Sequence, residues 1–104
     1  MKRVLVAGCV MSAFIATHPT HAQTVTVTEG KVVILAVDPS DLVIQLDKPG
    51  RCGSSYFHVQ RTNQNFKEMT ALAMTAFASD KGMAVFVTSC STDRNIISHG
   101  YTGR

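Results

Sequence analysis

Short apolar runs separated by polar turn residues are typical of β-strands, and this chain contains several. Residues 31–37 and 42–46 are β-branched runs and each predict a strand, as do residues 55–60, whose Tyr56, His58 and Gln60 share one face; residues 23–28, where Val alternates with Thr, predict a short strand or a frayed leader. Asp38-Pro39-Ser40-Asp41 is a turn signal with Pro at its second position. The first two strands are therefore expected to form a hairpin.

Residues 65–79 change to the helical period. Asn65 followed by Glu68 predicts a capping box at the start of a helix, and Gly82 predicts its C-terminal cap. One apolar stripe is expected to pack on the sheet; it consists of Phe66, Met69, Leu72, Ala73, Ala76 and Phe77. Its expected partners are Val33 or Ile34, Val43, and Val85 or Val87.

Two more strands follow the helix, over residues 83–90 and, more weakly, 96–101. The chain is therefore expected to be α+β and mainly β, with one helix between the third and fourth of five strands. That order favours a five-stranded barrel of the OB type. A strongly curved antiparallel sheet with the helix packed across it is the alternative, since both arrangements cover the apolar face of the sheet.

The N-terminal 22 residues have the pattern of a secretory signal peptide. Lys2 and Arg3 precede an apolar run of 13 residues, and Thr20-His21-Ala22 predicts cleavage after Ala22. The run is shorter than the roughly 20 residues of a membrane span. Lipidation of Cys9 in Val6-Ala7-Gly8-Cys9 is a less favoured alternative, because it leaves too short an apolar segment before the cleavage site. We expect an exported chain, periplasmic or secreted, with no membrane contact after cleavage.

Removal of residues 1–22 leaves a single small domain, 23–104, with eight basic and seven acidic residues, so the net charge falls from +3 to +1. A nucleic-acid-binding domain usually gathers its positive charge in a patch or a stripe. Seven of the eight basic residues are scattered between positions 31 and 94, and the eighth ends the chain: Lys31, Lys48, Arg51, Arg61, Lys67, Lys81, Arg94 and Arg104. No nucleic-acid partner is expected.

Cys52 and Cys90 are the cysteines that remain after cleavage. In an exported chain, two cysteines predict a structural disulfide. The alternatives are a free nucleophilic thiol and a metal site with His58 and His99. We favour the disulfide and expect no metal and no cofactor.

Motifs of known catalytic sites do not occur: the sequence has no G-x-S-x-G, no H-E-x-x-H and no phosphate-binding glycine loop. Ser91 or Ser98 with His99 and Asp93 could in principle form a Ser-His-Asp site. Such a site is defined by geometry and not by closeness in sequence. We expect that the protein is not an enzyme.

Recognition is expected in the polar segment CSTDRN, residues 90–95, and on one face of the third strand. Asp93 and Arg94 offer charge in a loop, and Ser55, Tyr56 and His58 offer polar groups beside it. The alternative is a solvated turn with an Asp93–Arg94 or cross-loop ion pair. His58 would then be a solvent-facing strand residue, and His99 a loop residue near the C-terminus.

The run from Gly30 to Cys90 resembles the B subunits of subtilase-cytotoxin and pertussis-like bacterial toxins. The resemblance rests on Gly30-x-Val32-Val33-Ile34, on Phe66-Lys67-Glu68-x-x-x-Leu72-Ala73, and on a small loop that leads into Val85-Phe86-Val87. It implies a secreted OB-fold protein that forms pentamers, binds host glycans and carries a separate catalytic subunit.

Two functional classes follow from these observations. The first is a secreted, non-catalytic binding module of the toxin B-subunit type that recognises host or surface glycans. The alternative is a small periplasmic structural or inhibitory protein that binds another protein.

Overall fold

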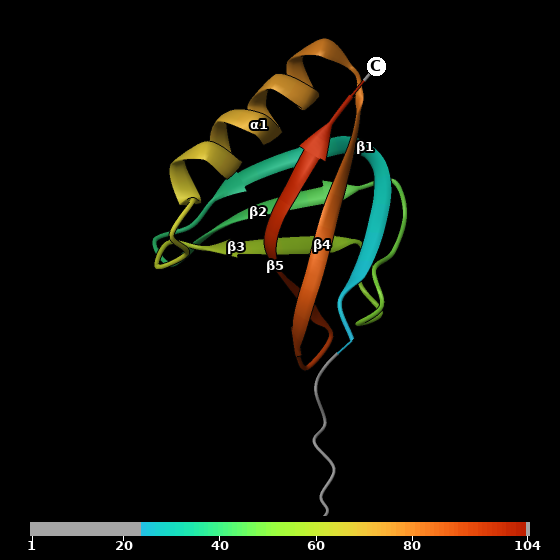
Figure 1. Ribbon diagram of the computed structural model, residues 1–104, viewed down its shortest axis with the longest axis vertical. Helices are drawn as coiled ribbons and strands as arrows, with labels where there is room; N and C mark the ends of the chain where they lie inside the picture. Colours follow the sequence, from blue (N-terminus) through green and yellow to red (C-terminus); the bar gives the residue numbers. More distant parts are fainter. Residues whose placement is uncertain (1–23, 104) are drawn as a thin grey trace, which may run out of the picture.

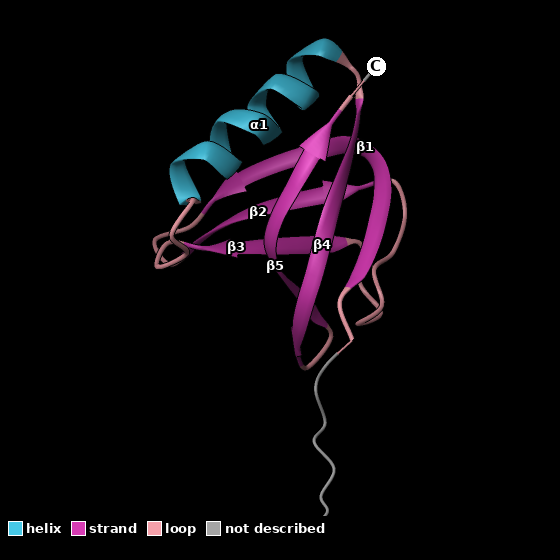
Figure 2. Ribbon diagram, in the orientation of Figure 1, coloured by secondary structure: helices cyan, strands magenta, loops and turns pink. Residues whose placement is uncertain are grey.

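The computed structural model describes residues 24–103. The predicted signal peptide, with the alternative lipidation site at Cys9, lies outside these residues. Five strands and one helix follow one another in the order expected from the sequence (Figures 1 and 2). They are β1 (Thr26–Val37), β2 (Asp41–Leu46), β3 (Tyr56–Gln60), α1 (Phe66–Ser79), β4 (Gly82–Ser91) and β5 (Arg94–Thr102).

The strands form a closed barrel in the order β1-β2-β3-β5-β4. Every neighbouring pair is antiparallel except β3 and β5, which are parallel. The helix lies across one end of this curved sheet (Figure 1). The expected α+β, mainly β, OB-type barrel with a helix between the third and fourth strands is confirmed.

The long strand β1 takes part in both sides of the barrel. Residues 26–31 pair with β4, and residues 32–37 pair with β2, with a register shift between Val32 and Ile34. Such an irregularity bends a strand and increases its twist. The predicted strands 23–28 and 31–37 are therefore one continuous strand that bends where it changes partner.

The barrel interior is filled by apolar side chains from all five strands and the helix. The buried cluster consists of Val32, Leu42, Ile44, Leu46, Phe57, Val59, Met69, Ala73, Ala76, Met83, Val85, Val87 and Ile97. On β1 the inward positions are Val32 and the partly buried Leu35. The expectation that Val33 or Ile34 meets the helix is wrong, since these side chains are 47% and 46% exposed.

The ends of α1 differ from the predicted capping. The side chain of Asn65 makes no capping bond to the helix and instead accepts a hydrogen bond from the Asn63 amide. At the other end, Asp80 takes a left-handed conformation with φ 57°, and its backbone N–H bonds to the carbonyls of Ala76 and Phe77. Asp80 is therefore the C-cap, and Gly82 already belongs to β4.

Phe77 does not reach the core, contrary to the expected apolar stripe. The buried residues of α1 are Met69, Ala73 and Ala76, whereas the Phe77 side chain is 49% exposed. Successive helical residues point about 100° apart, because a turn takes about 3.6 residues. Phe77 therefore lies on the flank of the stripe, beside the exposed Met74, and small alanines form the contact with the sheet.

Two methionines of the same helix test this packing. Met69 is 2% exposed and Met74 is 57% exposed. We expect Met69→Ala to lower the free energy of unfolding by about 2–5 kcal/mol, because it leaves a cavity in the core. Met74→Ala should change it by no more than about 0.5 kcal/mol. Urea unfolding of both variants measures the difference, and equal losses would contradict the described face of the helix.

Candidate functional site

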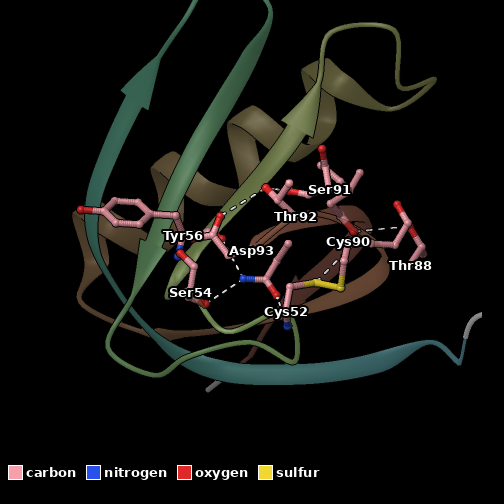
Figure 3. The surroundings of a disulfide bond; sticks show 11 residues. Cys52, Ser54, Tyr56, Thr88, Cys90, Ser91, Thr92 and Asp93 are labelled. Carbon is pink, nitrogen blue, oxygen red and sulfur yellow. Dashed lines mark hydrogen bonds between the residues drawn. A yellow bond between two sulfur atoms is a disulfide. The ribbon is translucent and has the colours of Figure 1, made fainter.

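Cys52 and Cys90 form the disulfide predicted from the sequence, with their Cα atoms 5.6 Å apart. The bond joins the loop before β3 to the end of β4 (Figure 3). The cysteines are thus neither free thiols nor metal ligands, and residues 24–103 contain no cluster of three His, Cys, Asp or Glu side chains suited to a metal ion.

The same loop is held by Asn95, whose side chain is fully buried. Its Nδ2 donates hydrogen bonds to the carbonyls of Ser54 (2.7 Å) and Tyr56 (2.9 Å), and its Oδ1 accepts one from the backbone N–H of Cys52 (2.9 Å). Gly50 leaves room for this amide, since a Cβ there would overlap both the Asn95 side chain and the Phe57 ring. Three hydrogen bonds therefore fasten the loop to the start of β5.

This closure brings β5 against β3, although the two strands align only at Phe57 with Asn95 and at His58 with Ile96. Arg94 begins β5 and so lies beside His58. Asp41 begins β2, which pairs with the other edge of β3. Three charged or titratable side chains from three different strands meet at this point.

Asp41 and His58 form a buried pair under Arg94. Their side chains are 9% and 8% exposed, and Asp41 Oδ2 lies 3.0 Å from His58 Nδ1. The half-exposed Arg94 places Nη2 3.7 Å from the same carboxylate oxygen and 3.3 Å from Nδ1. A carboxylate oxygen needs a donor at this distance, so the Nδ1–H tautomer of His58 satisfies it.

The second oxygen of Asp41, Oδ1, is buried and has no hydrogen-bond partner. A buried polar atom without a partner costs about 1–3 kcal/mol. Buried polar atoms in folded proteins are nearly always hydrogen-bonded, so a donor bound at Oδ1 would be favourable.

Asp41 and Arg94 lie in the wall of a polar groove of about 440 Å³, which we call the Arg94 groove. It is lined by Ser40, Asp41, Gln60, Thr62, Ser89, Ser91, Arg94 and Ile96. Hydroxyl, amide, carboxylate and guanidinium groups surround one space. The groove can therefore both donate hydrogen bonds to a ligand and accept them from it.

A second hollow, of about 470 Å³, lies on another part of the barrel. It is lined by Glu29, Gly30, Lys31, Asp47, Lys48, Gly82, Met83, Ala84, Tyr101 and Gly103. Its Asp47 carboxylate already accepts a hydrogen bond from the backbone N–H of Lys31 (2.9 Å). The two unpartnered buried side-chain atoms of residues 24–103 belong to Thr26 and Asp41, and neither residue lines this hollow. The Arg94 groove is the stronger candidate site.

Of the five residues suggested by the sequence, Arg94 lines the groove and His58 lies directly beneath it. The alternative expectation for His58, a solvent-facing side chain, is wrong, since the residue is 6% exposed. Ser55, Tyr56 and Asp93 do not line the groove. In Figure 3 the Tyr56 ring points away from the disulfide, toward the outside of the barrel.

The turn between β4 and β5 is shorter than the expected 90–95 loop, because β4 continues to Ser91 and β5 begins at Arg94. The expected Asp93–Arg94 ion pair does not form, and Arg94 pairs with Asp41 instead. The sequence predicts Asp41 as part of the turn Asp38-Pro39-Ser40-Asp41. Its pairing with His58 depends on the register of β2 and β3, for which the sequence holds no local signal.

His99 lies in β5 and not in a C-terminal loop, so that expectation is also wrong. Its ring stacks on Phe86, with centroids 4.1 Å apart and planes 12° apart. Ser98 Oγ is 2.6 Å from His99 Nδ1, but no carboxylate of residues 24–103 forms an ion pair with this ring. The described residues therefore do not assemble the Ser-His-Asp arrangement considered from the sequence.

The fold that positions this site is that of bacterial toxin B subunits. The chain is similar to the crystal structure of the cholera toxin-like B-subunit from Citrobacter freundii, with a TM-score of 0.59. The match covers 82% of this chain and 88% of that chain, at 13% sequence identity. The resemblance to toxin B subunits is thereby confirmed for the fold. No protein-family model and no curated protein matches the sequence.

The described part of the chain has one helix, α1, and it is neither long nor apolar enough to cross a membrane.

Reduction of the disulfide tests how far the fold depends on it. The bond spans 38 residues of sequence, for which the loss of chain entropy corresponds to about 3–4 kcal/mol. For a domain of this size, reduction should lower the melting temperature by more than about 10 °C. Calorimetry with and without a reductant measures this shift, and two alkylatable thiols in the native protein would contradict the bond.

Proposed function

We propose that the protein is an exported, non-catalytic binding module that holds a saccharide in the Arg94 groove. The observation that carries the proposal is the Asp41 carboxylate, which lines the groove together with Arg94 and whose buried Oδ1 lacks a partner. A small rotation of the Asp41 side chain would open Oδ1 to a sugar hydroxyl, and the N–H groups of the Arg94 guanidinium would donate to sugar oxygens.

The composition and size of the groove support a polyhydroxylated ligand. Three serines, a threonine and a glutamine surround the charged pair. Its volume of about 440 Å³ lies within the range of about 300–1,000 Å³ that is usual for small-molecule sites. OB-type barrels commonly bind oligosaccharides or oligonucleotides. The small net charge of the chain without its first 22 residues favours the saccharide.

Export is part of the same proposal. Residues 1–22 would direct secretion and be removed, leaving residues 23–104 as the mature domain. The Cys52–Cys90 disulfide supports an oxidising destination, because such bonds persist mainly in exported proteins. The similarity to a toxin B-subunit supports the same conclusion.

We further propose that the module forms a homo-oligomer, a pentamer by resemblance, which would carry a separate catalytic subunit. Each half of β1 pairs with one strand, so each half leaves one edge without a strand partner among the described residues. The half formed by residues 32–37 also exposes Val33, Ile34 and Val37. An open edge with exposed apolar side chains is a usual place for another chain to add.

Light scattering tests the oligomer. We expect the mass of five copies for the exported protein, and a smaller mass for Ile34→Lys, because a charge would be placed in the interface. Val25→Lys is the control, since Val25 is 51% exposed but precedes β1. A monomeric wild-type protein would instead favour the alternative function, a small periplasmic structural or inhibitory protein that binds another protein.

A glycan array with three variants tests the groove. We expect Asp41→Asn to weaken binding about tenfold or more, because an amide nitrogen would replace an acceptor oxygen and a hydrogen bond to a charged group would be lost. Arg94→Ala should do the same. Asp93→Asn, the same chemical change in the exposed turn, should leave binding unchanged.

Melting curves of these variants show whether they are folded. The proposal fails if the wild-type protein gives no array signal, or if folded Asp41→Asn and Arg94→Ala bind as the wild type does.

A further inference from the structure

Two groups compete for one carboxylate oxygen at the Arg94 groove: Arg94 in its wall and His58 beneath it. His58 Nδ1 is 3.0 Å and Arg94 Nη2 is 3.7 Å from Asp41 Oδ2. The two nitrogens are themselves 3.3 Å apart. This arrangement is stable as long as only one of the two partners carries a full positive charge.

Neutral His58 satisfies that condition. Its Nδ1–H donates to Asp41, while the Arg94 guanidinium forms an ion pair with the same oxygen next to an uncharged ring. Arg94 then lies in the wall of the groove, where its remaining N–H groups are free to bind.

Protonation of His58 places two cations 3.3 Å apart. Like charges at this separation repel strongly where water is excluded, and the single negative charge of Asp41 balances only one of the two cations. The His58 side chain is 8% exposed and is covered by its neighbours on the outer face of β3, whereas the Arg94 side chain is 50% exposed and can move into solvent. The imidazolium also binds Asp41 more strongly than the neutral ring does. Arg94 is therefore the group that leaves.

Other charged groups do not compensate for this repulsion. On β2 and β5, the strands that flank β3, the charged or titratable residues besides Asp41 and Arg94 are His99, which stacks on Phe86, and Tyr101, whose ring lies 6.1 Å from that of Phe86. The charged residues of α1, Lys67 and Glu68, are exposed and form no hydrogen bond or ion pair with His58. The effect of protonating His58 therefore depends on Asp41 and Arg94.

We propose that protonation of His58 displaces Arg94 from the groove, so that the protein releases its saccharide as the pH falls. Histidine is the side chain that ordinarily changes charge between about pH 5 and 8. The groove would bind with His58 neutral and would lose Arg94 as a ligand contact once the ring is charged. The release rests on the proposed function, whereas the displacement of Arg94 does not.

The displacement is tested without any ligand by NMR of the exported protein between pH 5 and 8. The side-chain ¹⁵N signals of Arg94 and His58 should move with the same midpoint. His58→Gln should abolish the movement of the Arg94 signal, because glutamine does not titrate. His99→Gln, which removes the other histidine of residues 24–103, should leave it in place. An Arg94 signal that stays constant through the titration of His58 would overturn the proposal.

The release is tested with the saccharide that binds most strongly on the array, added as the free sugar at pH 7.5 and 5.5. We expect binding to be about tenfold weaker at the lower pH, within the usual range of coupling between sites. His58→Gln should bind equally at both pH values, and His99→Gln should behave as the wild type does. Tighter binding at pH 5.5 would overturn the release. If no saccharide binds at all, the proposed function fails, and the NMR titration still decides whether Arg94 moves.

Discussion

The Asn95 carboxamide closes the barrel between β3 and β5, where few backbone hydrogen bonds join the two strands. β3 and β5 align at two residue pairs, in the parallel arrangement that is slightly less stable per residue than the antiparallel one. The buried Asn95 side chain forms three further hydrogen bonds, with the backbones of Cys52, Ser54 and Tyr56. They join β5 to the loop before β3, beyond the two residue pairs of the strands themselves. The disulfide ties the same loop to β4. Without this closure the two sides of the sheet would share little more than β1.

The candidate site depends on the same closure. Arg94 directly precedes Asn95, so the bonds that hold Asn95 also hold the backbone from which Arg94 extends over His58. Cys90 is flanked by Ser89 and Ser91, which both line the groove. The contacts that stabilise the closure and the walls of the candidate site are therefore formed by neighbouring residues. The side chains of Asn95 and Cys90 hold the strands, and those of Arg94, Ser89 and Ser91 face the groove.

A buried carboxylate paired with a histidine is a poor means of stabilising a small barrel. Removing Asp41 and His58 from water has a cost that apolar side chains of similar size would avoid. The cost is greater here, because Asp41 Oδ1 lacks a partner. A ligand that donates to this atom would remove the penalty on binding. The energetic cost of the unpartnered Oδ1 and the proposed recognition of a ligand thus have one physical origin.

The order of elements, the helix and the disulfide could be predicted from the sequence, because each depends on a local period or on residue type and compartment. The packing face of the helix could be predicted only in part. The sequence places Ala73, Ala76 and Phe77 together near the end of the helix. The close approach of α1 to the sheet buries the two alanines and leaves Phe77 exposed.

The site itself was decided by the tertiary structure. The sequence indicates His58 and Arg94 as polar candidates near the β4–β5 turn, but it predicts Asp41 only as part of the turn before β2. Asp41, His58 and Arg94 come from three strands, and they meet because of the register of β2 on β3 and the parallel contact of β3 with β5. Strand register and barrel closure arise from contacts between distant segments, so no short stretch of sequence contains them.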